Sequence, residues 1–220
     1  MKKRIIRIAS LALVILGMVS CSDEQETALR PQDAKSIPMT FLVSHPGQAS
    51  RATETNFEKN DKIGLYVADA KAQLEIGGNL VNNEALTYDG SKWTAARALY
   101  WDKGTYTAYA YYPYIENVSS ITDQSFSVAL DQRVAKTATS LGGYEASDLL
   151  FATSKNISAS ASPINLTFKH IMSKLKIRLV KGEDFEGEMP ATADVYIHNT
   201  VPTATVDLQA GVATRYVKGT

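Results

Sequence analysis

The stretch Ile37–Arg51, IPMTFLVSHPGQASR, decides how the rest of the chain is interpreted. Its apolar side chains recur at every second position, namely Ile37, Met39, Phe41 and Val43. A period of two predicts a β-strand with one apolar face, and that face needs a host sheet. The polar run SHPGQASRATETN that follows predicts an exposed loop, which a trypsin-like protease could enter at Arg51. We infer that the first strand covers an apolar groove and that a cut in this loop lets it leave.

Composition and charge narrow the class of protein. The 220 residues are 45% hydrophobic and 21% charged, which is ordinary for a globular chain. The first 20 residues hold four basic and no acidic residues, so the remainder carries 19 basic against 23 acidic residues, a net charge of −4. Nucleic-acid binding needs a concentrated basic face, so nucleic acid is not an expected partner.

The amino terminus has the pattern of an export signal. A basic start, residues 2–7, leads into an apolar run, residues 8–16, that is too short to span a bilayer well. The run ends on Met18-Val19-Ser20-Cys21, which resembles a bacterial lipobox, where the cysteine becomes acylated. We expect residues 1–20 to be a signal peptide and Cys21 to be lipidated; the alternative is an ordinary signal with an incidental cysteine. Because Cys21 is the only cysteine, an internal disulfide, a CxxC redox pair and a cysteine-rich zinc site are excluded.

Residues 21–36 are polar and aperiodic, which predicts a flexible tether between lipid and fold. The acidic residues Asp23, Glu24 and Glu26 resemble the surface-export signal of lipoproteins from Bacteroides-type Gram-negative bacteria. The alternative is an acidic spacer that faces the periplasm. Either way, the expected anchor is the outer membrane, through the lipid.

From Asp61 onward the sequence predicts one strand after another, so the expected fold is all-β. Asp89-Gly90 tolerates the positive φ angles of a tight turn and predicts a hairpin of residues 85–88 and 92–94. A second hairpin is expected to join residues 98–101 to residues 105–112.

Two alternating sets of opposite parity lie in residues 164–180, Leu166 with Phe168 and Leu175 with Ile177 and Leu179. Either a bulge at residues 170–173 or a single helical turn between two strands explains the change of parity, and we favour the bulge.

The expected domains are an amino-terminal β-sandwich over residues 37–181 and, over residues 182–220, a connector with an incomplete second β domain. About 40 residues cannot enclose a core of their own. The strands expected at residues 193–197 and 203–208 therefore either join the first sheet or begin a second domain that is incomplete here, which is the alternative we favour.

Tyrosines crowd the segment Thr105–Tyr114, with Trp93 and Trp101 nearby. Aromatic residues at both parities predict that both faces of this strand are covered and that the strand is central. Core packing is the favoured explanation. In the alternative, Trp93, Trp101, Tyr109 and Tyr111 are exposed and form a platform on which sugars stack.

Catalytic patterns are missing from the sequence. The three histidines, His45, His170 and His198, form no HExxH pair, and no GxSxG or phosphate-binding glycine loop occurs. The acidic run that contains Glu183, Asp184, Glu186 and Glu188 lacks the spaced ladder of a calcium loop. We expect no enzyme activity, no cofactor and no metal.

Five segments in order, the lipobox, SRATETNFEKNDKIGLYV, ARALYWDKGTYTAYAYYPY, DLLFATS and LTFKHIMSKLKI, resemble the amino-terminal half of a fimbrillin-family protein, the Mfa-like and FimA-like subunits of type V pili. The resemblance implies a transthyretin-like β-sandwich, export as a lipoprotein and assembly with other fimbrial subunits by β-strand addition. It also implies an arginine-specific, trypsin-like protease that cuts the loop after the first strand.

Carried over to this sequence, the resemblance makes Cys21 the lipidated residue, Ile37 to Val43 the displaced strand and Arg51 the cut site. Arg30, in the tether, competes for the cut but precedes Pro31, which trypsin-like enzymes disfavour. Full burial of the four inward side chains would contribute about 6–12 kcal/mol to the stability of the fold. The protein would lose this contribution if the strand left after a cut. The alternatives are a surface glycan-binding lipoprotein and a tip or anchor fimbrial subunit that keeps its first strand and does not polymerise.

Overall fold

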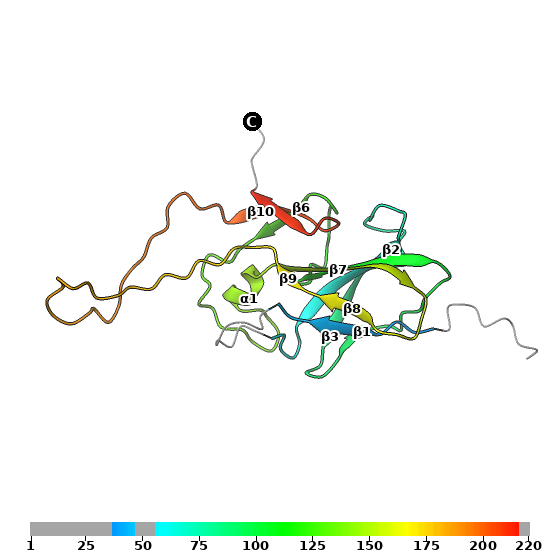
Figure 1. Ribbon diagram of the computed structural model, residues 1–220, viewed down its shortest axis with the longest axis horizontal. Helices are drawn as coiled ribbons and strands as arrows, with labels where there is room; N and C mark the ends of the chain where they lie inside the picture. The colour runs from blue at the N-terminus through cyan, green and yellow to red at the C-terminus, as the bar shows by residue number, and fades with distance from the viewer. Residues whose placement is uncertain (1–36, 47–55, 216–220) are drawn as a thin grey trace, which may run out of the picture. The chain divides into compact units, whose positions relative to one another are not determined.

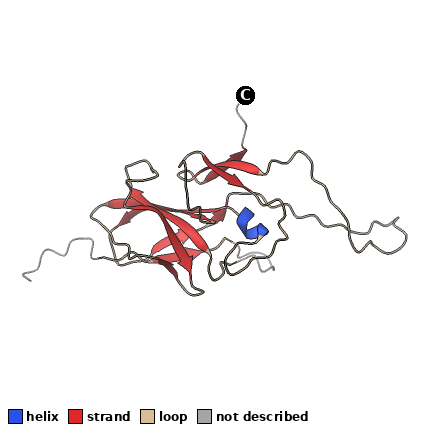
Figure 2. Ribbon diagram, turned by 180° about the vertical axis from the view of Figure 1, so that it is seen from behind, coloured by secondary structure: helices blue, strands red, loops and turns tan. Residues whose placement is uncertain are grey.

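The computed structural model describes residues 37–46 and 56–215. These residues form the strands β1 (Phe41–Ser44), β2 (Lys62–Asp69), β3 (Val81–Tyr88), β4 (Trp93–Ala95), β5 (Thr105–Tyr112), β6 (Gln124–Ser127), β7 (Leu150–Ser158), β8 (Ile164–Thr167), β9 (Lys169–His170), β10 (Thr203–Asp207) and β11 (Val212–Arg215), and one helix, α1 (Gly143–Ser147). Strands dominate in Figure 2, where the helix is a single short coil. The predicted all-β class is confirmed, while its transthyretin-like detail stays a prediction.

A six-stranded sheet in the order β4-β3-β2-β5-β7-β9 is the centre of the fold, and its neighbouring strands are antiparallel. Alternate residues of β5 enter different cores: Ala108, Ala110 and Tyr112 face one core, and Tyr109 and Tyr111 face the other. The tyrosine-rich strand is therefore interior and covered on both faces, as its sequence predicts.

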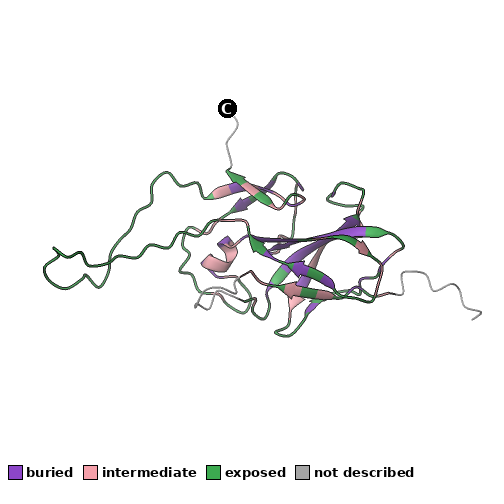
Figure 3. Cartoon of the chain, viewed as in Figure 1, coloured by how far each residue is buried: buried purple, intermediate pink, exposed green. Residues whose placement is uncertain are grey.

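Each face of this central sheet has its own covering layer (Figure 1). On one face lie β1 and β8, which pair in parallel register from Phe41↔Ile164 to Ser44↔Thr167. The other face is covered by a three-stranded sheet in the order β11-β10-β6, whose Phe126 and Val206 share a core with Tyr109 and Tyr111. Figure 3 shows the resulting burial along the central strands.

The two predicted hairpins have different outcomes. Between β3 and β4, Asp89 accepts backbone hydrogen bonds from Ser91 and Lys92, and Gly90 has a φ of 103°, so the first hairpin is confirmed. The second hairpin is wrong, because β5 pairs with β2 and β7 instead of with residues 98–101. Residues 99–101 instead bond to the start of the first strand.

The chain changes partners at Phe168, between β8 and β9. β8 pairs with β1 in the covering layer, and β9 pairs with β7 at the edge of the central sheet. The second alternating set, from Leu175 to Leu179, lies beyond β9 in residues that form no strand, so the bulge that we favoured between two strands at residues 170–173 is not formed. Residues 171–202, all of which are described, contain no strand, so the strands predicted around Ile177 and over residues 193–197 are not formed.

The last strands return to the layers already described. β10 pairs with β6 from Thr203↔Ser127 to Val206↔Gln124, and Val206 and Leu208 are buried in the second core. The described residues belong to one compact unit. Of the two alternatives for residues 203–215, the structure therefore has the one in which these strands join the first body, and it differs from the separate second domain that we favoured.

Candidate functional site

The first strand presents its side chains alternately to the protein and to solvent. Met39 is 7% exposed, and Ile37, Phe41 and Val43 are half-buried against the same core. Leu42, by contrast, is 58% exposed. The four residues assigned to a displaced strand are thus the ones that face the central sheet.

Backbone hydrogen bonds hold this segment along both edges. On one edge the N–H of Met39 donates to the carbonyl of Leu99 (2.8 Å), and the N–H of Trp101 donates to the carbonyl of Ile37 (3.0 Å). On the other edge, the amides of Ile164 and Phe168 donate to the carbonyls of Thr40 (2.8 Å) and Ser44 (3.0 Å). Odd-numbered residues bond to one side and even-numbered residues to the other, as in an interior strand. We call the space between residues 99–101 and β8 that this segment fills the first-strand slot.

The floor and walls of the slot are apolar. The core cluster on this side includes Ile63, Leu65 and Val67 of β2 and, from the two walls, Leu99, Trp101, Ile164, Leu166 and Phe168. A fully buried side chain of this size contributes roughly 1.5–3 kcal/mol, and since three of the four inward residues are only half-buried, we put their sum at about 4–8 kcal/mol. This is a large part of the free energy of unfolding of a typical domain, which is roughly 5–15 kcal/mol. The protein would therefore be poorly stable with its slot empty.

Aromatic and histidine side chains gather where the first strand ends. The ring of His45 packs edge-on against Phe57, with centroids 4.8 Å apart, and lies 5.9 Å from the ring of His170. His170 Nδ1 is in turn 2.7 Å from Asp148 Oδ1. His45 precedes and Phe57 follows residues 47–55, so the two ends of the segment that contains Arg51 meet at one place.

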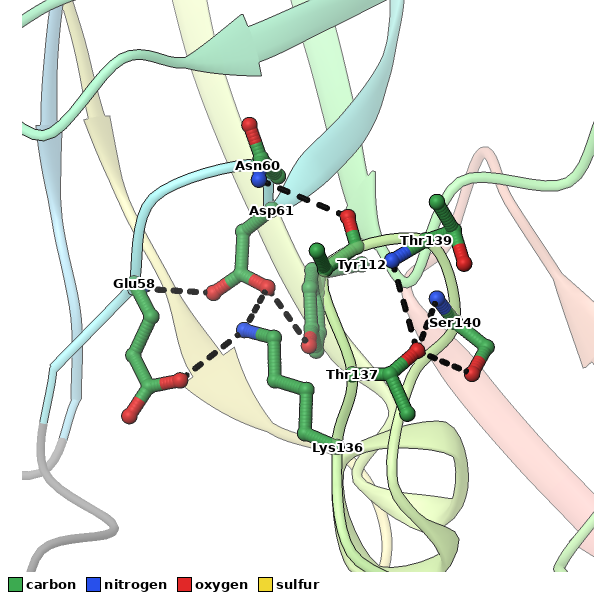
Figure 4. Close-up of polar contacts among 9 residues, drawn as sticks. Glu58, Asn60, Asp61, Tyr112, Lys136, Thr137, Thr139 and Ser140 are labelled. Atoms are coloured by element: carbon green, nitrogen blue, oxygen red, sulfur yellow. Dashed lines mark hydrogen bonds and ion pairs between the residues drawn. The ribbon is translucent and has the colours of Figure 1, made fainter.

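Beside this point, a buried ion pair joins the start of β2 to a distant loop (Figure 4). The Nζ of Lys136 donates to Asp61 Oδ1 at 2.6 Å and lies 3.1 Å from Glu58 Oε2. The N–H of Glu58 and the hydroxyl of Tyr112 also donate to the Asp61 carboxylate, at 2.7 and 3.4 Å. Asp61 is only 3% exposed, so these donors replace the water that its charge would otherwise need.

The protonation of this cluster follows from its contacts. Burial disfavours the ammonium form of Lys136, but hydrogen bonds to Asp61 and Glu58 outweigh burial and raise the pKa of Lys136 above its ordinary value. Burial, followed by the negative charge of Asp61, raises the pKa of Tyr112 as well. Lys136 therefore stays charged and Tyr112 stays neutral throughout the physiological range, which keeps the loop anchored.

The residues assigned to a sugar platform lie in the two cores. The exposed fractions of Trp93, Trp101, Tyr109 and Tyr111 are 8%, 0%, 8% and 1%. The Tyr111 ring occupies the space that a Cβ at Gly64 would need, and its hydroxyl donates to Asn83 Oδ1 at 2.6 Å. Their burial is that of core residues, so in this structure they offer no aromatic face on which a sugar could stack.

Sequence reasoning did not find two parts of the site. Residues 99–101 were assigned to a hairpin, although they form one wall of the slot. The Asp61–Lys136 pair joins residues 75 positions apart and has no motif that would signal it. Cys21, Arg30 and Arg51 lie outside the described residues.

Residues 37–46 and 56–215 contain neither a metal site nor a membrane-spanning helix. No group of three or more His, Cys, Asp or Glu side chains in these ranges is arranged to hold a metal ion. No helix within them is both long and apolar enough to cross a membrane.

Known proteins resemble this chain in sequence and in fold. A family model described as fimbrillin-like matches residues 50–219. A protein named "Putative fimbrium tip subunit Fim1C", from Bacteroides ovatus, is 30% identical over 129 residues, which are 54% of this chain and 23% of that protein. The present chain thus matches less than a quarter of the length of this relative.

Two solved structures share the fold. Each is of a "putative cell adhesion protein", one from Bacteroides uniformis and one from Bacteroides ovatus, and the TM-scores are 0.53 and 0.52 at 18% sequence identity. The similarity covers 83% of this chain in both cases and 67% and 68% of the two neighbours.

The ion pair beside the slot gives a prediction for stability. Lys136→Met removes the ammonium and leaves the Asp61 carboxylate buried without a counter-ion, so we expect the free energy of unfolding in urea to fall by about 3–5 kcal/mol. Lys155→Met, at an exposed lysine that forms no ion pair within the described residues, should change it by less than about 0.5 kcal/mol. Adding Asp61→Asn to Lys136→Met should recover part of the loss. Equal stability of the two lysine variants would contradict this account.

Proposed function

The chain belongs to the fimbrillin-like family, and from that premise we propose that it is a fimbrial subunit that assembles by strand exchange. A protease cuts after the first strand, residues 37–44 leave the slot, and a strand of another subunit takes their place. The family itself makes the chain a structural or adhesive protein of a cell-surface appendage and not an enzyme.

The observation that carries this proposal is the double-edged bonding of the first-strand slot. An edge strand can leave a sheet without exposing two new edges, but here both residues 99–101 and β8 would lose their partner. Unpaired backbone groups on both walls and an apolar floor suit the addition of an extended strand. Main-chain hydrogen bonds would supply attachment, and the sites left by Ile37, Met39, Phe41 and Val43 would set the register.

Processing at Arg51 is proposed because of where the cut falls. The residues on either side of the segment, His45 and Phe57, pack against each other, so a cut between them separates the first strand from β2 without removing any strand of the central sheet. A cut at Arg30 would leave the first strand covalently attached, which is why Arg30 is the weaker candidate.

Lipid attachment at Cys21 is proposed from the lipobox pattern, with the acidic residues after it as the signal for the cell surface. The anchored precursor would sit in the outer membrane until processing releases it into the fimbria.

A second candidate is a tip or anchor subunit that keeps its first strand. The specific observation in its favour is that the Bacteroides ovatus relative is named as a fimbrium tip subunit. Such a subunit would have the same fold, but residues 37–44 would stay in the slot after any cut.

Cleavage site choice can be measured directly. With an arginine-specific protease, limited digestion should give a product whose amino-terminal sequence starts at Ala52, and Arg51→Ala should remove that product while Arg30→Ala leaves it. Arg133 and Arg178 are exposed and serve as internal controls. Cleavage after these two residues, measured by intact-mass spectrometry of the digest, should be the same in both variants. A first product that starts at Pro31, or one unaffected by Arg51→Ala, contradicts the assignment.

Strand exchange is tested with a cut that spares the rest of the chain. Residues 47–53 are replaced by a tobacco etch virus protease site, and a fluorescent peptide of residues 36–46 is added before and after cleavage. We expect at least tenfold more peptide to be retained after the cut, because the tethered strand then no longer outcompetes it. The same peptide with Met39→Asp and Phe41→Asp should not be retained.

Trp101 provides a second readout in the same experiment. Its side chain is fully buried and its amide bonds to Ile37, so in a Trp93→Phe background its fluorescence should stay at short wavelength while the peptide replaces the first strand, and should shift to longer wavelength only if the slot is left empty. Retention of the original strand with no peptide uptake would favour the tip or anchor subunit and would rule out exchange.

Lipidation has its own test. Metabolic labelling with an alkyne fatty acid should mark the chain and should be lost in Cys21→Ser, which should also move the protein from the membrane to the soluble fraction. Label that persists in Cys21→Ser would exclude this residue as the anchor.

A further inference from the structure

The two walls of the first-strand slot hold different parts of the first strand. Residues 99–101 bond to Ile37 and Met39, whereas the backbone hydrogen bonds from β8 run from Thr40 to Ser44. Within the described residues, the two sets of bonds meet only at Met39 and Thr40. There the amide of Met39 donates to one wall and the carbonyl of Thr40 accepts from the other, both at 2.8 Å. The first strand is therefore enclosed from both sides at this one point.

The burial of the inward side chains agrees with this arrangement. Met39 is 7% exposed and belongs to the buried cluster beneath the slot, while Ile37, Phe41 and Val43 are only partly buried against that cluster. Met39 thus has the deepest side chain of residues 37–46. We call the space that its side chain fills the Met39 site.

The Met39 site is suited to a long apolar side chain. The cluster to which Met39 belongs consists of aliphatic and aromatic residues from the floor and both walls, among them Leu65, Leu99, Trp101, Ile164 and Leu166. A methionine side chain is unbranched and adapts its shape to an irregular space. A shorter side chain would leave part of the site empty, and because packed surroundings relax only in part, the contacts of the missing atoms would be lost.

The inference drawn from this geometry rests on the strand exchange proposed above. We propose that the Met39 site selects the incoming strand and fixes its register. The strand that replaces residues 37–44 must place a long apolar side chain, of the size of methionine or leucine, in this site. The other inward positions are less enclosed and accept apolar side chains of different sizes.

Register selection follows from the two-residue period of a strand. A shift of the incoming strand by one residue would turn its apolar side chains to solvent, so the apolar pattern already excludes that register. A shift by two residues keeps the apolar face inward and differs mainly in which side chain enters the Met39 site. One deep site among shallower ones is what distinguishes these otherwise similar registers.

The test uses the cleaved protein and the fluorescent peptide of residues 36–46 described above. Met39→Ala should lower retention of the peptide at least tenfold, and at least about three times more than Val43→Ala does, because it empties the deepest site. A peptide with norleucine at position 39, which has the length of methionine without its sulfur atom, should be retained like the unchanged peptide. Leu42→Ala, at an outward residue that is 58% exposed, is the matched control and should leave retention unchanged.

A peptide of unchanged composition separates position from overall hydrophobicity. When Met39→Val and Val43→Met are made together, the peptide keeps the same side chains but presents the shorter one to the Met39 site, so its retention should fall by about fivefold or more. The Trp101 amide bonds to the carbonyl of Ile37 in the intact chain. Hydrogen exchange at this amide should slow when the unchanged peptide binds and should slow less with the exchanged one, which reports the register directly.

The outcomes separate this proposal from strand exchange itself. Equal retention of the unchanged, Met39→Ala and exchanged peptides would overturn selection by the Met39 site and leave strand exchange standing. If not even the unchanged peptide is retained, strand exchange fails and the selection fails with it. The uncut chain gives an independent measure, since Met39→Ala should lower its thermal unfolding midpoint more than Val43→Ala. Equal midpoints would mean that the Met39 site is no deeper than its neighbours, which also overturns the proposal.

Discussion

The central sheet is apolar on both faces, and this one constraint organises the rest of the molecule. β2, β5 and β7 all place alternate side chains in different cores, so neither face of the sheet can be left to solvent. The chain covers one face with β1 and β8, and the other with β6, β10 and β11. Each cover joins segments that are far apart in sequence. The amino-terminal strand is therefore part of the core.

Local sequence patterns predicted those features that depend on local chemistry. The alternation from Ile37 to Val43 identified the inward side chains, because period two fixes which side chains share a face. Asp89-Gly90 identified its hairpin because only a few residue pairs tolerate that turn. The aromatic residues of β5 identified a strand covered on both sides. In each case the deciding interaction lies within a few residues.

The same local patterns could not predict which segments pair with each other. Residues 98–101 have the composition of a hairpin strand, yet they form a wall of the first-strand slot, because Leu99 and Trp101 bond to residues at the start of the fold. Residues 174–180 alternate as well as β1 does but form no strand, since a strand needs hydrogen-bonding neighbours that its own sequence does not supply. Neither the parallel pairing of β1 with β8 nor the Asp61–Lys136 pair has a short-range signature.

Covalent attachment of the first strand explains why proteolysis would be needed for exchange at all. While residues 47–55 link β1 to β2, the strand competes for its slot at an effective concentration on the order of millimolar. A free strand at micromolar concentration is then at a disadvantage of about a thousandfold, or about 4 kcal/mol. A cut removes that advantage but leaves the side-chain contribution of about 4–8 kcal/mol in place. Cleavage alone therefore would not empty the slot; in the proposed assembly, the incoming strand must displace the old one, so that the apolar face of the central sheet is never left uncovered.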